Sequence, residues 1–163
     1  MEFEKLSKLI FDGMKPRLEN NQGLSTFAKE RAKFEGWLKV ELCDSLSKYF
    51  MDIAPEKGRI DVTFDDWAIQ LKTVNTNIRY PGVKNKHRPI TKNVQGVIDD
   101  IEKLRSVAYL KEAVLFVTFP ITHDNRYWQT QLQRTSSLLR KVEYIQFNFL
   151  NGIPGVIYLG LIQ

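Results

Sequence analysis

Cysteine, internal repeats and long apolar runs are almost absent from this sequence. The single cysteine, Cys43, excludes an intrachain disulfide and a thiolate metal cluster. No apolar run is long enough to span a bilayer, and the first residues, MEFEKLSKLIFDGMKPR, lack the apolar centre and small-residue cleavage site of a secretory signal. We therefore expect a cytoplasmic protein that does not insert into a membrane.

The length and composition are those of one globular domain. The chain has 163 residues, of which 43% are hydrophobic and 26% are charged. This length allows a sizeable core, and the composition is not that of a disordered chain. Low-complexity tracts and linker-like stretches are also missing, so we predict a single domain over residues 1–163.

Hydrophobic periodicity indicates an alternation of helices and strands. Helices are expected over residues 2–11, 94–108 and 125–142, and the longest helix, whose apolar face covers residues 34–53, has Ser25 as its candidate N-cap. Asp124 is the candidate N-cap of the helix over 125–142. Strands are expected over residues 59–64, 67–74, 113–121, 143–150 and 155–163, with a short extra strand over 78–80. Apolar strands surrounded by amphipathic helices favour an α/β sandwich.

The net charge of +5 and the pI of about 9.3 favour a polyanionic partner. Much of the charge falls in residues 75–93, which hold six basic side chains, counting His87, and no acid. Such a segment suits contacts with a phosphate backbone, and the alternative is a solvated loop. His87 is a candidate proton shuttle within it. The candidate nucleic-acid contacts are Arg79, Lys84, Lys86, Arg88 and Lys92.

The stretch RIDVTFDDWAIQLKT, residues 59–73, holds the residues best suited to chemistry. Asp65-Asp66 is a candidate turn between two strands, and side chains two apart in a strand share a face. Gln70 and Lys72 therefore point the same way, and Asp61 can lie beside them. A carboxylate and an amide oxygen suit Mg²⁺, while a lysine can activate water or neutralise charge. The alternative is a hairpin whose polar face is merely solvated.

This stretch, with the preceding FEGWLKVELCDSLSKYF, resembles the PD-(D/E)XK nuclease superfamily over about residues 33–120. The resemblance implies a restriction-endonuclease-like fold, an α/β fold with a central mixed β-sheet flanked by helices. It also implies a metal-dependent DNA endonuclease that uses Mg²⁺, or Mn²⁺, to hydrolyse phosphodiester bonds. Asp61 matches the family's metal-binding aspartate, Gln70 its second acidic position and Lys72 its lysine.

Two positions depart from the family pattern. Ile60 stands where a proline often precedes the aspartate, at a position that varies in the superfamily. Gln70 replaces an acid, which removes a negative charge from the metal site and should lower its affinity for Mg²⁺. Some members are similar in carrying glutamine there and remain nucleases. The alternative function is an inactive nucleic-acid-binding or protein-interaction domain that retains the fold.

The family also places a glutamate on the helix before the hairpin, and two residues compete for this role. By helical angle Glu35 lies within the apolar stripe and Glu41 on its other flank. We expect Asp61, Gln70 and Glu35 to bind the metal, with Glu41 as the alternative acid and the turn residue Asp66 as a weaker one. Cutting both strands usually requires two active sites, so a homodimer is also expected.

Overall fold

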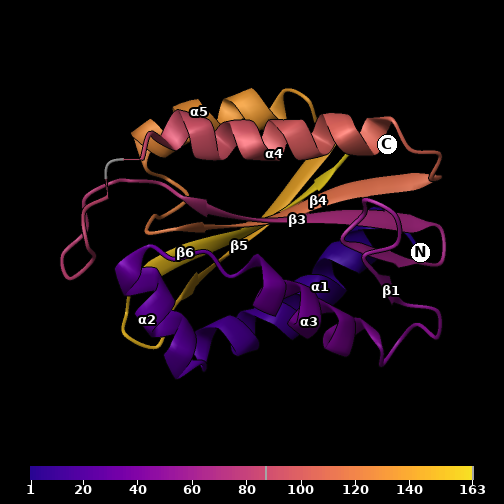
Figure 1. The fold of residues 1–163 in the computed structure, drawn as a ribbon, viewed down its shortest axis with the longest axis horizontal. Coiled ribbons are helices and arrows are strands. Elements are labelled where there is room, and N and C mark those ends of the chain that lie inside the picture. The colour runs from indigo at the N-terminus through magenta and orange to yellow at the C-terminus, as the bar shows by residue number, and fades with distance from the viewer. Residues whose placement is uncertain (87, 163) are drawn as a thin grey trace.

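The computed structural model describes residues 1–86 and 88–162. In these residues a six-stranded mixed β-sheet carries helices on both faces, which confirms the expected α/β architecture (Figure 1). The helices are α1 Phe3–Glu19, α2 Gln22–Glu30, α3 Glu35–Leu46, α4 Ile90–Arg105 and α5 Arg126–Ser136. The strands are β1 Ala54–Pro55, β2 Val62–Phe64, β3 Trp67–Asn75, β4 Lys111–Phe119, β5 Lys141–Asn148 and β6 Pro154–Leu161.

The strands follow the order β1-β2-β3-β4-β6-β5. Neighbours β1, β2 and β3 pair antiparallel, and α4 then carries the chain back so that β4 pairs parallel to β3. Strand β6 pairs antiparallel with both β4 and β5. The central strands β3 and β4 are buried along nearly their whole length, as expected for strands covered on both sides.

Alternation along β3 divides its side chains between two hydrophobic layers. Trp67, Ile69 and Leu71 pack in the layer formed with α1, α2 and α3. Ala68 and Val74 pack in the other layer, under α4 and α5. Because side chains alternate along a strand, Gln70 and Lys72 also face α4.

Several helix boundaries differ from the expectations drawn from periodicity. Helix α1 continues through Pro16 to Glu19 because buried Leu18 still packs into the core. The single long helix expected from Ser25 to residue 53 is wrong: it is two helices, α2 and α3, because Arg31 ends α2 in a left-handed conformation. Helix α3 ends at Leu46, and the chain turns so that Phe50 packs against Phe64 with ring centroids 4.6 Å apart. Helix boundaries are thus set by packing as well as by local pattern.

The helix caps also differ from those expected. Asn21, and not Ser25, caps α2, since its side chain accepts a hydrogen bond from the Leu24 N–H. Asn125 caps α5 in the same way, whereas the neighbouring Asp124 accepts a hydrogen bond from Thr122. Asparagine is as good an N-cap as serine or aspartate, so residue type alone does not decide which residue caps the start of α2 or of α5.

The short strand expected over residues 78–80 is wrong. Residues 76–80 are irregular, and Asn77 has a left-handed φ of 56°. The Ile78 carbonyl accepts a hydrogen bond from the Arg31 guanidinium instead of pairing with another strand.

In the described part of the chain, none of the helices combines the length and apolar character needed to cross a membrane.

Candidate functional site

The site begins at the hairpin of β2 and β3, which forms as expected. Asp65 and Asp66 make the turn, and Asp65 adopts a left-handed φ of 46°. Aspartate tolerates this conformation better than most residues, because its short side chain bonds to the local backbone. The backbone pairing of β2 with β3 starts next to the turn, where Phe64 pairs with Trp67, and its last pair is Val62 with Ile69.

Beyond that last pair, side chains take over the contacts between the two segments. The Asp61 N–H donates to Gln70 Oε1 at 2.8 Å, and Asp61 Oδ2 accepts from the Leu71 N–H at 2.8 Å. The two segments therefore stay close without a regular ladder, and β3 continues past β2 paired only with β4. The expectation that Asp61 lies beside Gln70 is confirmed.

Lys72 lies two residues further along β3, on the same face as Gln70. It is half-buried, whereas its strand neighbours are buried. Its Nζ lies 3.2 Å from Oδ2 of Asp100 on α4. Gly96, one turn earlier on α4, leaves room for the lysine, because a Cβ there would lie 3.2 Å from Lys72 Cε.

Asp100 is a residue that the sequence analysis missed. Burial raises the pKa of its carboxyl group, Lys72 opposes this shift, and the charge of Asp61 adds a smaller increase. Its Oδ2 is buried and has no well-directed hydrogen bond among the described residues, although the Lys72 charge is near. A signal was present in the sequence, since Asp100 flanks the apolar stripe of α4 between Val97 and Ile101.

Helix α3 contributes a cation to this place. Lys39 Nζ lies 3.0 Å from Asp61 Oδ1 and 2.8 Å from Glu56 Oε1. Glu35 lies one turn before Lys39 on the same side of α3. Its Oε1 lies 4.0 Å from Lys33 Nζ, which is a long distance for an ion pair. Glu35 therefore remains the predicted helix acid.

The structure places the other helix acid elsewhere. Glu41 follows Lys39 by two residues, which turns it to the opposite side of the helix. There Arg17 of α1 binds both Glu41 and Asp44. Asp66 is likewise engaged away from Gln70 and Lys72, with Lys111 Nζ at 2.9 Å. The structure therefore engages Glu41 and Asp66, the alternative acids of the sequence analysis, in ion pairs away from Gln70 and Lys72.

The donor set fits a hard cation that is held loosely. Asp61, Gln70 and Asp100 bring two carboxylates and an amide oxygen to one neighbourhood, and Asp100 Oδ2 is a buried oxygen with spare acceptor capacity. Across residues 1–86 and 88–162, no three His, Cys, Asp or Glu side chains lie close enough to form a metal cluster by themselves. Mg²⁺ commonly uses one or two carboxylates and completes its shell with water and substrate phosphate, which matches this set.

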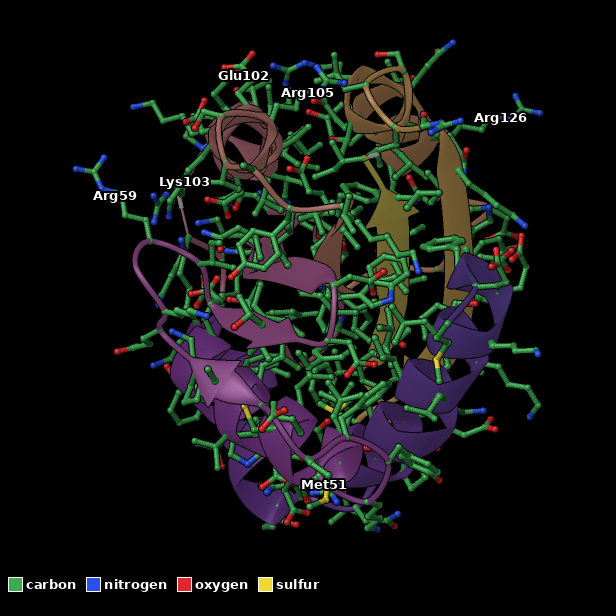
Figure 2. The ribbon with its side chains drawn as sticks, turned by 90° about the vertical axis from the view of Figure 1, so that its right-hand side faces the viewer. Met51, Arg59, Glu102, Lys103, Arg105 and Arg126 are labelled. Atoms are coloured by element: carbon green, nitrogen blue, oxygen red, sulfur yellow. The ribbon has the colours of Figure 1, made fainter. Side chains whose placement is uncertain are left out.

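Positive charge surrounds the site. Arg59, on the loop before β2, and Lys103, on α4, project from the same side of the molecule (Figure 2). The Lys103 charge also acts to lower the pKa of Asp100, after the stronger effects of burial and Lys72. Cations in these places favour the approach of a polyanion.

The basic segment after β3 is exposed and is held by a few anchors. Lys84 forms an ion pair of 2.6 Å with Glu30, and its backbone N–H donates to the Lys29 carbonyl. The side chains of Arg79, Lys86, Arg88 and Lys92 are exposed or half-buried, as phosphate contacts would require. His87, the candidate proton shuttle, lies outside the described residues.

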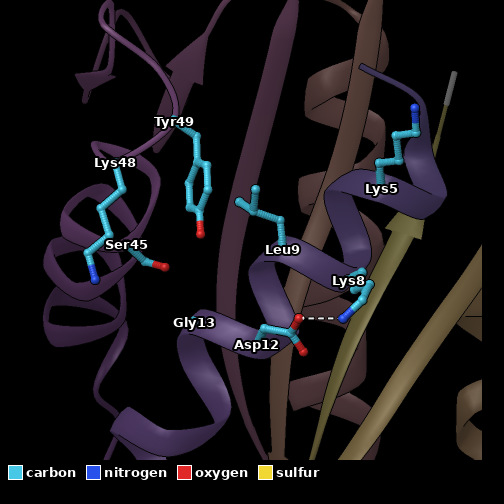
Figure 3. Close-up of a pocket in the computed structure, with 8 residues that line it drawn as sticks. All are labelled: Lys5, Lys8, Leu9, Asp12, Gly13, Ser45, Lys48 and Tyr49. Carbon is cyan, nitrogen blue, oxygen red and sulfur yellow. Dashed lines mark hydrogen bonds and ion pairs between the residues drawn. The ribbon is translucent and has the colours of Figure 1, made fainter.

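A separate surface pocket of about 390 Å³ lies between α1 and α3 (Figure 3). Its lining includes Lys5, Ser45 and Tyr49, and its Lys8 and Asp12 form an ion pair of 2.6 Å. None of the residues that line this pocket belongs to the candidate site, so the two are distinct.

Comparisons with protein-family models, with curated proteins and with solved structures find no match to this chain.

Proposed function

We propose that this protein is a metal-dependent DNA nuclease with a restriction-endonuclease-like fold. The order of elements supports the proposal. Helix α3 precedes the antiparallel strands β2 and β3, and α4 then leads to the apolar strand β4, which is parallel to β3. The resemblance seen in the sequence implies this same order around the aspartate and the lysine.

One observation carries the functional proposal. Asp61, Gln70 and Lys72 gather where β2 ends and β3 continues, and α4 adds Asp100, a half-buried residue whose Oδ2 is buried. An amphipathic hairpin with a solvated polar face would have no reason to bury Gln70, which is 3% exposed, or to place a second carboxylate against Lys72. An acid whose pKa is raised by burial and opposed by a specific charged partner, as for Asp100 beside Lys72, is a candidate for a functional site.

Each side chain has a role that follows from its position. Asp61, Gln70 and Asp100, with Glu35 as a further candidate, would hold Mg²⁺ or Mn²⁺. When bound, such a cation polarises the phosphate and lowers the pKa of water. Lys72 orients the attacking water, accepts its proton or stabilises the charge that develops on the phosphate. Asp100 keeps the Lys72 ammonium in place through their ion pair.

The second candidate is a DNA-binding module that does not cut. It is favoured by the engagement of two key groups within the protein itself. Gln70 Oε1 already accepts the Asp61 N–H, and the Lys72 charge is already paired with Asp100. A site with a neutral amide in place of an acid binds its cation more weakly, and cleavage is then the first property to be lost.

A cleavage assay with matched variants tests the proposal. The wild type should cut DNA in the presence of Mg²⁺ or Mn²⁺, and Lys72→Ala should lower the rate by about 10²–10⁴-fold, the usual contribution of a group that moves a proton. Gln70→Glu should lower the Mg²⁺ concentration needed for half-maximal cleavage. Lys48→Ala, which removes an exposed lysine from the α1–α3 side, should cut like the wild type.

The alternatives give different results. A wild type that binds DNA but cuts none of its linear, nicked or circular forms, while Gln70→Glu gains cleavage, would identify the binding module. Cleavage that survives Lys72→Ala unchanged would show that the active groups lie elsewhere.

A further inference from the structure

Arg31 is a buried cation without an acidic partner in the described part of the chain. It ends α2 in a left-handed conformation with φ 55°, and its side chain is 3% exposed. Its guanidinium donates to Asn75 Oδ1 at 2.8 Å and to the carbonyls of Lys84 and Ile78. These three acceptors are neutral, so the guanidinium is hydrogen-bonded but has no counterion among the described residues, whereas buried charges are normally paired.

Beside Arg31 lies a pocket of about 230 Å³, which we call the loop pocket. Its polar lining consists of Arg31, Lys33, Lys86, Arg88, Asn75 and Asn93. Four of these six residues are cations, and the described lining includes no acid. The start of α4 adds the partial positive charge of a helix N-terminus, since Arg88 precedes it and Asn93 lies in its second turn.

Asn93 adds a second and independent requirement for the ligand. It is 5% exposed, and its Nδ2 donates to the Asn75 carbonyl at 2.8 Å. This hydrogen bond fixes the orientation of the amide group. Its Oδ1 is buried and has no hydrogen-bond partner in the described residues. An unpaired buried acceptor is costly, so the ligand should supply a donor as well as negative charge.

The loop pocket lies close to the candidate active site. Helix α4 places Asn93 seven residues before Asp100, and at about 1.5 Å per residue this is about 10 Å. Strand β3 places Asn75 three residues after Lys72, and at about 3.3 Å per residue this is again about 10 Å. A separation of about 10 Å corresponds to about three base steps of 3.4 Å along one DNA strand.

We propose that the loop pocket binds the end of a DNA strand. Phosphate oxygens would face Arg31 and Arg88, and a terminal hydroxyl would donate to Asn93 Oδ1. A continuous DNA strand offers phosphates without hydroxyls, whereas a strand end offers both. The hydroxyl is that of the 3′-terminal sugar, because the surrounding cations favour the deprotonated form of a 5′-phosphate, which then has no proton to donate. The proposal rests on DNA as the substrate of the proposed function.

Binding to defined DNA forms tests this proposal. The probe is a single-stranded oligonucleotide labelled internally, used as a closed circle and as the linear strand of the same sequence. The linear strand is prepared with both natural ends, without its 5′-phosphate, and without its 3′-hydroxyl. The protein is the full chain carrying Lys72→Ala, so that cleavage does not interfere with the affinity measurement.

A pair of variants separates end recognition from general charge. Arg88→Gln removes a cation that lines the pocket, and Lys92→Gln removes one from the same segment that does not. Both side chains are exposed, so folding should be preserved. We expect the linear strand to bind at least about tenfold tighter than the circle, as one charge-assisted hydrogen bond allows. Arg88→Gln should reduce this ratio, and Lys92→Gln should weaken both forms equally.

The linear variants identify which end is bound. Loss of the preference on removing the 3′-hydroxyl is the expected result. Loss only on removing the 5′-phosphate would overturn the assignment of a hydroxyl donor to Asn93 Oδ1. Equal affinity for circle and linear strand overturns the proposal, as does a preference that neither removal changes. An equal effect of Arg88→Gln and Lys92→Gln on both forms also overturns it.

The same experiment separates this inference from the proposed function. End-selective binding by a wild type that never cuts would retain the loop pocket and reject the nuclease. Cutting of circles and linear strands at equal rates, without end preference in binding, would retain the nuclease and reject the pocket. If both hold, wild-type digestion of linear DNA should release products of about one to three nucleotides, given the 3.4 Å rise per base step.

Discussion

Replacement of Asp61 separates the structural and chemical roles of this side chain. Its Oδ2 accepts the Leu71 N–H where the backbone ladder ends, and its Oδ1 contacts Lys39. Asp61→Ala removes both contacts. Asp61→Asn keeps an oxygen for the Leu71 N–H but removes the negative charge. Both variants should lose metal-dependent cleavage, whereas only the alanine variant should lose substantial stability.

The size of the stability loss follows from these contacts. A hydrogen bond to a charged group contributes about 1.5–3 kcal/mol, and the lower part of that range applies because Asp61 is partly exposed. The ion pair with Lys39 adds at most about 1 kcal/mol. Asp61→Ala should therefore lower the free energy of unfolding by about 2–3 kcal/mol, and Asp61→Asn by about 1 kcal/mol or less. At about 2–4 °C per kcal/mol, the alanine variant should melt about 5–10 °C lower.

Urea and thermal unfolding measure the first effect, and cleavage of linear DNA with Mg²⁺ measures the second. The assay must be run well below the melting temperature of the alanine variant, so that unfolding does not imitate loss of catalysis. An asparagine variant that cuts at the wild-type rate would refute the role of the Asp61 charge. An alanine variant as stable as the wild type would refute the role of Asp61 in ending the hairpin ladder.

Two further predictions concern α4 and the buried acid of β4. Gly96→Ala should raise the free energy of unfolding by about 0.5–1 kcal/mol, because alanine has a higher helix propensity than glycine. It should also slow cleavage, because the new Cβ would lie 3.2 Å from Lys72 Cε and displace the lysine. Cleavage at the wild-type rate would contradict this role of Gly96. Burial raises the pKa of Glu112 in the folded protein above its value in the unfolded chain. The protonated side chain therefore favours the folded state at low pH, and this contribution to the free energy of unfolding is lost as the pH rises through the pKa of the folded state. Glu112→Gln should therefore gain stability relative to the wild type between acidic and neutral pH in urea titrations, and a pH-independent difference would show that burial has no such effect.

The sequence predicted most elements of the fold because their local patterns are strong. The continuous apolar run of β4 and the Asn-Gly turn between β5 and β6 indicate strands without any tertiary information. The extra strand over residues 78–80 was wrong for a reason that lies far away in the chain. Arg31, from the end of α2, binds the Ile78 carbonyl and holds the segment in an irregular conformation.

The candidate site was predictable only where its residues are close in sequence. Asp61 and Gln70 belong to one hairpin, and two-residue alternation brings them together. Periodicity alone left Glu35 and Glu41 as alternatives, and only the packing of α1 against α3 engaged Glu41 with Arg17. The role of Lys39 at Asp61 could not be read from the helix pattern.

By itself the sequence determined most of the strands and helices, and the shared face of Gln70 and Lys72, because these depend on backbone geometry over a few residues. The tertiary structure alone decided what meets that face. The crossover through α4 brings Asp100 against Lys72, and the end of α2 brings Arg31 to the loop after β3. Lys72 and Asp100 are 28 positions apart in the chain, and Arg31 and Asn75 are 44 positions apart. Burial raises the pKa of Asp100 and lowers the pKa of Arg31, and this burial arises only once the helices have packed on the sheet.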